Sequence, residues 1–230
     1  MDESLMIRVE GLFKRFTLHV QGGAVIEALH DVDLAVGQGE CVALHGPSGS
    51  GKSTLLRSLY ANYQPSRGKI LVRHGEGYVD MASSAPRLVL AVRRETMAYV
   101  SQFLRVIPRV SALNLVTEPL LDLGAGEREA LDRAKSLLTR LNIPERLWGL
   151  APATFSGGEQ QRVNLARGFC ACKPVLLLDE PTASLDAANR NVVVDLILEA
   201  KAQGQAVVGI FHDEPVRDAV ADRLFHLEAA

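Results

Sequence analysis

Long apolar runs are missing from this sequence of 230 residues. A helix that crosses a bilayer needs roughly 20 predominantly apolar residues, and no stretch here approaches that length. The opening MDESLMIRVE carries acidic residues where a secretory signal has basic and then apolar ones. We therefore expect a cytoplasmic protein without direct membrane insertion.

Neither sign of charge dominates, since 25 Lys and Arg face 27 Asp and Glu for a formal net charge of −2. This balance argues against a strong general attraction to nucleic acid or to anionic membranes. Cysteine is scarce, and Cys41, Cys170 and Cys172 form an odd set without metal-ligand spacing. We interpret all three as reduced thiols and expect no nucleic-acid partner.

Repeats, low-complexity tracts and disordered linkers are also missing. The sequence is 47% hydrophobic and 23% charged, which is typical of one globular domain. Apolar and polar residues alternate over residues 7–12 and 28–36, which predicts two strands. An apolar run at 41–44 then leads through a glycine-rich turn into a predicted helix at 53–60.

Further along the chain, the runs at 175–178 and 206–211 do not alternate, which predicts strands buried on both faces of a parallel sheet. Apolar residues recur at helical spacing within 128–141. Strand, helix and strand in this order predict an α/β core with a helical insertion. We divide the single domain 1–230 into a core of residues 1–102 and 161–230 and a helical subdomain of residues 103–160.

The segment GPSGSGKS at 46–53 matches a phosphate-binding loop and lies, as that motif requires, between a strand and a helix. Its backbone N–H groups and the helix start favour phosphate oxygens. Lys52 is predicted to reach the β- and γ-phosphates, and Ser53 to ligate magnesium. The predicted phosphate-binding residues are Gly46, Ser48, Gly49, Ser50, Gly51, Lys52, Ser53 and Thr54.

Two acidic residues, Asp179 and Glu180, directly follow the apolar run at 175–178. Ligands bind at the carboxyl ends of strands in open α/β sheets, and consecutive strand side chains point apart. We therefore predict that Asp179 ligates magnesium and that Glu180 activates the attacking water. A solvated acidic turn before Pro181 is the alternative.

A four-residue motif, Ser156-Gly157-Gly158-Glu159, precedes another predicted helix. Ser156 and Glu159 have the spacing of a capping box. Two glycines in a first helical turn are unfavourable for a simple cap. They suit a place where the phosphate of a bound molecule approaches the backbone closely.

Together these motifs resemble the nucleotide-binding domain of ATP-binding cassette (ABC) proteins over essentially the whole chain. The resemblance implies a P-loop NTPase of ABC type, with a mixed-sheet RecA-like core, an antiparallel β subdomain and a helical signature subdomain. The matching motifs are residues 46–53, Gln102, 156–160, 175–180, 184–186 and His212.

What the resemblance implies for function is ATP hydrolysis with Mg²⁺ in composite sites, each shared with a second cassette. Gln102 then takes a catalytic role and ligates magnesium with Asp179, and His212 senses the γ-phosphate. Phe16 corresponds to the aromatic residue that stacks on adenine, although Phe13 lies close by. Whether the second cassette is identical or a paralogue stays open. A scaffold that does not hydrolyse ATP fits poorly with the intact Glu180 and His212.

Other stretches resemble the cassettes of the carbon–phosphorus lyase system. That implies a role in phosphonate breakdown, at the step that synthesises a ribose-phosphonate triphosphate, docked on the soluble carbon–phosphorus lyase core complex. The alternative is the ATP-binding subunit of a membrane ABC transporter of the lipoprotein-release or efflux type. The segment 103–109 suits either partner, and we expect its Arg105 and Arg109 to contact the partner. The resembling stretches are residues 44–46, 57–63, 102–108, 144–148, 154–156 and 209–213.

Overall fold

Two β-sheets form the centre of the computed structural model, which describes residues 4–18, 23–104 and 108–228. An antiparallel sheet has the strand order β2-β1-β4-β5, and a second sheet, parallel throughout, has the order β6-β7-β8-β3-β9. The first contains β1 (Leu5–Leu18), β2 (Ala24–Gly37), β4 (Arg67–His74) and β5 (Gly77–Asp80). The second contains β3 (Cys41–His45), β6 (Met97–Val100), β7 (Val175–Asp179), β8 (Ala206–Ile210) and β9 (Arg223–His226).

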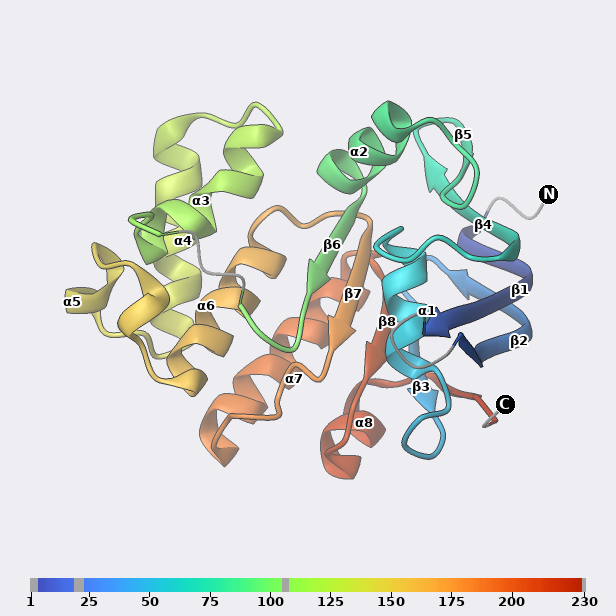
Figure 1. Ribbon diagram of the computed structural model, residues 1–230. Helices are drawn as coiled ribbons and strands as arrows, with labels where there is room; N and C mark the ends of the chain where they lie inside the picture. The colour runs from blue at the N-terminus through green and yellow to red at the C-terminus, as the bar shows by residue number, and fades with distance from the viewer. Residues whose placement is uncertain (1–3, 19–22, 105–107, 229–230) are drawn as a thin grey trace.

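Helices cover both faces of the parallel sheet, mostly on the side away from the antiparallel sheet (Figure 1). They are α1 (Lys52–Leu59), α2 (Pro86–Glu95), α3 (Ala112–Asp122), α4 (Glu127–Arg140), α5 (Glu145–Trp148), the 3₁₀ turn η2 (Pro152–Thr154), α6 (Gly157–Cys170), α7 (Ala187–Ala202) and α8 (Glu214–Val220). The predicted helix at 53–60 is confirmed as α1, and that at 128–141 as α4.

Strand β7 explains how the parallel sheet is stabilised. All five of its residues are buried, because each face of the strand packs into a different apolar core. Val175 and Leu177 join the core that contains α1 and the antiparallel sheet, whereas Leu176 and Leu178 join the core of α6 and α7. A run without alternation is the sequence pattern that such two-sided burial requires, and the prediction of a doubly buried strand is confirmed.

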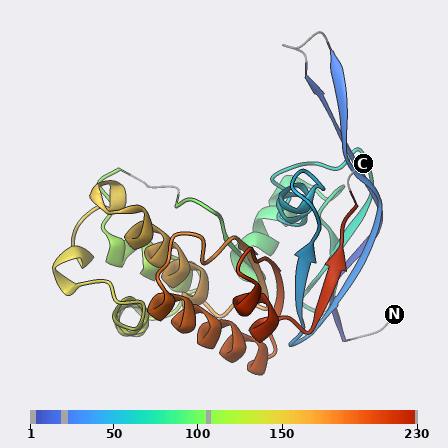
Figure 2. The same ribbon diagram turned by 90° about the horizontal axis from the view of Figure 1, so that it is seen from below.

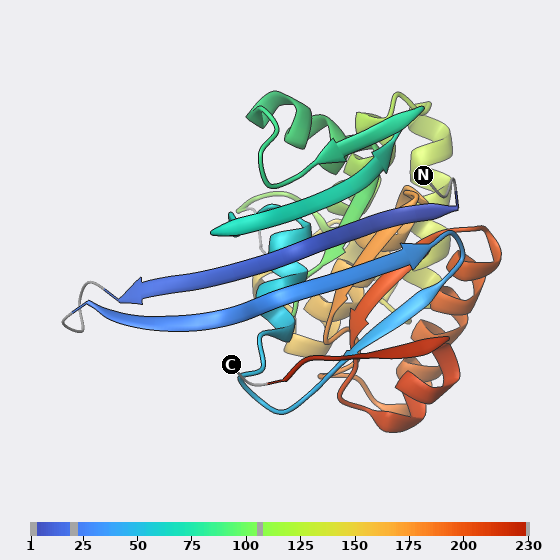
Figure 3. The same ribbon diagram turned by 90° about the vertical axis from the view of Figure 1, so that its right-hand side faces the viewer.

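The antiparallel sheet covers the other side of α1. Strands β1 and β2 pair along their length, from Leu5 opposite Gly37 to Leu18 opposite Ala24. Near the core the strands alternate between buried and exposed side chains. In β2, for example, Leu34 and Val36 are buried, and Ala35 between them is exposed. Farther out the hairpin projects beyond the rest of the molecule (Figures 2 and 3), where Val25 and Ile26 are exposed.

The α/β fold with an antiparallel sheet and a group of helices agrees with the predicted fold class. Helix α6 crosses residue 160, where we placed a subdomain boundary, and it packs on α3, α4 and β6. The division into core and helical subdomain stays a prediction. Within the described residues, every helix is too short or too polar to span a bilayer.

Candidate active site

The phosphate loop joins β3 to α1 and is enclosed by two other strands. Gly46 has φ +149°, and a Cβ there would lie 2.3 Å from Leu227 O, just after β9. Gly51 has φ +88°, and a Cβ there would lie 2.2 Å from Ala28 O of β2. Only glycine satisfies both the left-handed backbone and these close approaches. The loop shape therefore depends on β2 and the chain after β9.

The side chains of the loop point in different directions. Lys52 Nζ donates hydrogen bonds to Gly46 O at 2.7 Å and to Pro47 O at 2.8 Å, so its ammonium lies against the loop. Ser50 N–H donates to Pro47 O at 3.2 Å, and Ser50 Oγ is buried with no partner among the described residues. Ser50 thus shapes the loop, while Ser48 is exposed on it. Their phosphate contacts stay predictions, as does that of Thr54 in α1.

Asp179 and Ser53 provide the oxygen ligands predicted for magnesium. Ser53 Oγ lies 3.5 Å from Asp179 Oδ1, and the Asp179 side chain is only 2% exposed. Burial raises the pKa of this carboxyl, while hydrogen bonding from Tyr99 and the charge of Arg57 oppose that shift. A hydroxyl and a carboxylate are hard oxygen ligands, which suit Mg²⁺ completed by phosphate oxygens and water. The residues present therefore fit this ion.

Tyr99 and Arg57 are parts of this site that the motifs did not indicate. The Tyr99 hydroxyl donates to Asp179 Oδ2 at 2.9 Å, and Arg57 Nη2 lies 4.0 Å from the same oxygen. Burial, together with the Asp179 charge, raises the pKa of Tyr99, so that the phenol stays protonated and donates. The short strand β6 was not predicted, although the run Met97-Ala98-Tyr99-Val100 without polar alternation could have located the strand.

Glu180 is the centre of a second cluster at the same sheet edge. Gln102 Nε2 donates to Glu180 Oε2 at 2.9 Å, and His212 Nε2 lies 2.8 Å from Glu180 Oε1. Glu180 also has φ +53°, in the left-handed region. Such backbone strain in a non-glycine residue is often found at functional sites. All three predicted catalytic residues are brought together here, and Gln102 contacts Glu180 through its amide nitrogen.

The start of α6 forms the predicted capping box. Ser156 Oγ accepts from the Glu159 N–H at 3.3 Å, and Glu159 Oε2 accepts from the Ser156 N–H at 2.8 Å. A Cβ on Gly158 would lie 3.0 Å from Ser184 O, whereas one on Gly157 would meet nothing within 4 Å. The Gly157 side of the helix start is therefore open.

The two candidate adenine-stacking residues occupy different environments. Phe13 is 9% exposed and contacts His30 edge-on at 5.8 Å between ring centroids, so it belongs to the folded interior. Phe16 is only partly buried and contacts Tyr63 edge-on at 5.3 Å. Of the two, Phe16 is the more accessible. Its stacking on adenine stays a prediction.

Comparison with known proteins agrees with this geometry. The family model described as "ABC transporter" matches residues 29–183. The chain is 34% identical to the macrolide export ATP-binding/permease protein MacB 1 of Yersinia pestis bv. Antiqua (strain Antiqua) over 97% of this chain and 33% of that protein. It is 39% identical to MacB of Wolinella succinogenes over 92% of this chain and 32% of that protein. The chain thus spans about a third of the length of these curated relatives.

Among solved structures, the chain is similar to the dimeric structure of MJ0796, a bacterial ABC transporter cassette. The TM-score is 0.87 at 30% identity, with 97% of this chain and 95% of that chain covered. A post-hydrolysis state of the same cassette, bound to ADP and Pi, has a TM-score of 0.86 at 29% identity. On these matches and the geometry of its site, the chain belongs to the ABC transporter family, as an ATP-binding cassette whose cofactors are ATP and Mg²⁺.

Proposed function

We propose that this chain hydrolyses ATP in composite sites, each shared by two cassettes packed head to tail. The supporting observation is the position of the two glycine-rich motifs. Helix α1 packs in one apolar core and α6 in the other, on opposite faces of the parallel sheet (Figure 1). One chain is thus poorly placed to close its own phosphate loop and its own α6 start on one nucleotide. A second cassette in the opposite orientation supplies the missing half.

Within each site the residues divide the work of phosphoryl transfer. Lys52 would neutralise phosphate charge, while Ser53, Asp179 and Gln102 would hold the magnesium. When bound, this ion offsets the negative charge of the β- and γ-phosphate oxygens. The open helix start offers the Gly157 N–H to the nucleotide of the neighbouring cassette, since the Ser156 N–H is already donated to Glu159. Positioning and charge stabilisation are the main requirements of this reaction.

Glu180 is the proposed general base. Its two carboxylate oxygens face Gln102 and His212 at 2.9 and 2.8 Å, which orients the group. A base held in this way accepts the proton of a water aligned with the γ-phosphate. His212 contacts Glu180, and we propose that its side chain, which is 63% exposed, also contacts the substrate.

Replacing Glu180 with glutamine tests this mechanism. The Glu180→Gln variant should bind ATP with Mg²⁺ normally but hydrolyse it at least about 100-fold more slowly, since the amide cannot accept the proton. With ATP it should accumulate as a dimer in size-exclusion chromatography with light scattering, provided the chain pairs with itself. Glu76→Gln, on an exposed turn, is the matched control. Wild-type turnover by Glu180→Gln would exclude Glu180 as the base.

The partner that the ATPase drives has two candidates, and the comparisons favour a membrane permease. The relatives above are named as macrolide export ATP-binding/permease proteins, and this chain matches only their cassette-sized third. Under this proposal, the chain is the ATP-binding subunit of an export-type transporter. The permease would then lie outside residues 1–230.

The second candidate is a soluble complex of phosphonate breakdown, with this chain in the role of a PhnL-type cassette. It is supported by the stretches outside the shared motifs that resemble cassettes of the carbon–phosphorus lyase system, such as 57–63 and 144–148. In this role ATP hydrolysis serves the synthesis of a ribose-phosphonate triphosphate. The comparisons with known proteins support the family and the cassette, but they do not point to this system.

A groove beside Gln102 is the proposed docking surface for either partner. It has a volume of ≈ 730 Å³ and includes Arg57, Tyr63 and Phe103 in its lining. Phe103 is 75% exposed, and aromatic side chains are enriched in the cores of protein–protein interfaces. Arg109 is exposed with φ +66°, whereas Arg105 lies outside the described residues.

Affinity capture of the tagged chain distinguishes the two partners. Cells are grown on a phosphonate as the only phosphorus source, and membrane and soluble fractions are analysed separately. Recovery of an integral membrane permease alone supports the transport proposal and overturns the phosphonate proposal. Recovery of soluble phosphonate-cleaving enzymes without a permease supports the phosphonate proposal and overturns the transport proposal. Phe103→Ala should weaken capture of the true partner while sparing ATP binding, with Leu90→Ala as an exposed apolar control on α2.

A further inference from the structure

The carboxylate of Asp179 has a different partner on each oxygen. Oδ1 faces Ser53 Oγ at 3.5 Å, on the side of the phosphate loop. Oδ2 accepts the hydrogen bond from Tyr99 at 2.9 Å. Because a terminal carboxylate torsion is broad, backbone position alone does not fix the angle at which the plane of the carboxylate faces the loop. A hydrogen bond to one oxygen fixes this angle and therefore the direction in which the other oxygen points.

We propose that Tyr99 is a positioning residue for the magnesium site, whose hydroxyl holds Asp179 so that Oδ1 is presented beside Ser53. The proposal rests on the assignment of Asp179 to magnesium under the proposed function. Groups that hydrogen-bond to a metal ligand set its orientation, and losing one typically costs about 10- to 100-fold in metal affinity. No sequence motif marks Tyr99 for this role.

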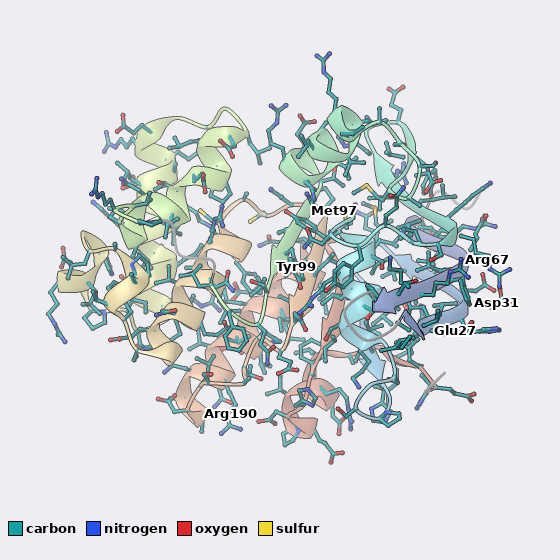
Figure 4. The ribbon with its side chains drawn as sticks, in the orientation of Figure 1. Glu27, Asp31, Arg67, Met97, Tyr99 and Arg190 are labelled. Carbon is teal, nitrogen blue, oxygen red and sulfur yellow. The ribbon has the colours of Figure 1, made fainter. Side chains whose placement is uncertain are left out.

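Tyr99 is itself held firmly enough to orient a neighbour. On β6 it pairs with Leu177 of β7, two residues before Asp179, so the hydrogen bond joins adjacent strands. Its ring lies 5.2 Å from that of Tyr60, with 31° between the planes. Figure 4 shows Tyr99 near the middle of the molecule, with α6 on one side and α1 on the other.

Arg57 has a different relation to the same carboxylate. Its Nη2 is 4.0 Å from Asp179 Oδ2, which is beyond hydrogen-bonding distance. Its Nη1 instead donates to the Tyr63 hydroxyl at 3.1 Å. Arg57 therefore supplies charge near Asp179, while the direct orienting contact comes from Tyr99.

The test compares Tyr99→Phe with Tyr60→Phe, since each variant removes one hydroxyl from the same pair of neighbouring rings. Binding of the non-hydrolysable analogue AMP-PNP is measured by calorimetry in EDTA and across a Mg²⁺ titration. We expect Tyr99→Phe to bind as wild type in EDTA but to need about tenfold more Mg²⁺ for half-maximal enhancement of binding. Tyr60→Phe should behave as wild type in both. The electron paramagnetic resonance spectrum of bound Mn²⁺ should change for Tyr99→Phe only.

Two outcomes for Tyr99→Phe alone overturn the proposal. One is an unchanged Mg²⁺ requirement for Tyr99→Phe. The other is a loss of AMP-PNP binding in EDTA that is as large as the loss in Mg²⁺, which indicates a general structural role. Asp179→Asn separates this proposal from the one on which it rests. If Asp179→Asn leaves the Mg²⁺ requirement unchanged, the metal assignment itself fails. If it raises the requirement, adding Tyr99→Phe should have no further effect, and an additive loss shows that Tyr99 does not act through Asp179.

Discussion

Single residues from distant parts of the chain meet in one cluster, whose catalytic role is proposed. Gln102 and Glu180 are separated by 78 residues, and Glu180 and His212 by 32, yet each pair is within hydrogen-bonding distance. They follow β6, β7 and β8, which are adjacent parallel strands. Since the carboxyl ends of parallel strands share one edge of a sheet, three separate motifs converge there. The strained Glu180 backbone, with φ +53°, is a local cost of this arrangement.

Lys52 gives a prediction at this scale. Lys52→Ala removes a cation that now donates to Gly46 O and Pro47 O and that is proposed to meet the phosphates. Hydrogen bonds to charged groups contribute about 1.5–3 kcal/mol each, so ATP affinity should fall at least about tenfold. Calorimetry measures the affinity, and circular dichroism checks the fold. Lys135→Ala, on the exposed side of α4, is the control. An unchanged affinity would contradict the role of Lys52.

At the scale of elements, the start of α1 depends on strands remote in sequence. The helix begins after Gly51, which has left-handed backbone and no side-chain cap. Two backbone carbonyls, Ala28 O from β2 and Leu227 O after β9, occupy the space where side chains at Gly51 and Gly46 would lie. The antiparallel hairpin and the last strand therefore help to set the shape of the phosphate loop. This dependence links the stability of β2 and β9 to nucleotide binding.

Two glycines of the loop provide a matched test of this packing. Gly51 and Gly49 have similar φ values of +88° and +84°, but a Cβ on Gly49 would meet nothing within 4 Å. Both alanine variants incur the left-handed backbone cost of roughly 1–2 kcal/mol. Gly51→Ala should lower the free energy of unfolding by about 2 kcal/mol more, because its Cβ overlaps Ala28 O. Urea unfolding measures the difference. An equal loss of unfolding free energy in the two variants would show that β2 shifts to accommodate the added methyl group.

At the scale of the whole molecule, the parallel sheet separates the two halves of the proposed ATP site. Leu55 and Leu56 of α1 pack in one core, and Val163 and Phe169 of α6 in the other. Each core lies on one face of the parallel sheet, so neither helix can reach the other face unless the sheet unfolds. Dimerisation is therefore a requirement of the proposed mechanism and not an addition to it. The dimeric structures of the MJ0796 relative support this arrangement.

Mixing two inactive variants tests the shared site. Lys52→Ala damages the phosphate loop, and Gly157→Asp adds a negative charge at the open helix start, where its side chain meets nothing in its own chain. Each variant alone has a defect in both sites of its dimer. A mixed dimer has one site with both defects and one intact site. Random pairing at equal amounts should restore up to about a quarter of wild-type ATPase activity, because half of the dimers are mixed. No recovery despite demonstrated mixing would argue against composite sites.

The sequence alone determined the local chemistry. The strand burial pattern, the phosphate loop between strand and helix, and the capping box of Ser156 and Glu159 all depend on residues close together in the chain. Patterns of this kind are set by backbone geometry and hydrogen bonding over a few residues, so the spacing of residue types was enough to predict them. The position of Asp179 and Glu180 at the carboxyl end of β7 was predicted in the same way, although their separate roles stay proposals.

Only the tertiary structure decided which distant groups meet. Pairing of β6 with β7 brings Tyr99 to Asp179, and the burial of Phe13 leaves Phe16 as the accessible aromatic residue. The identity of Tyr99 carries no local signal for this contact, because the same residue in another strand order would face a different partner. Separation of α1 and α6 by the sheet likewise follows from how the layers pack. Contacts between layers depend on the free energy of the whole packed core, which no short stretch of sequence contains.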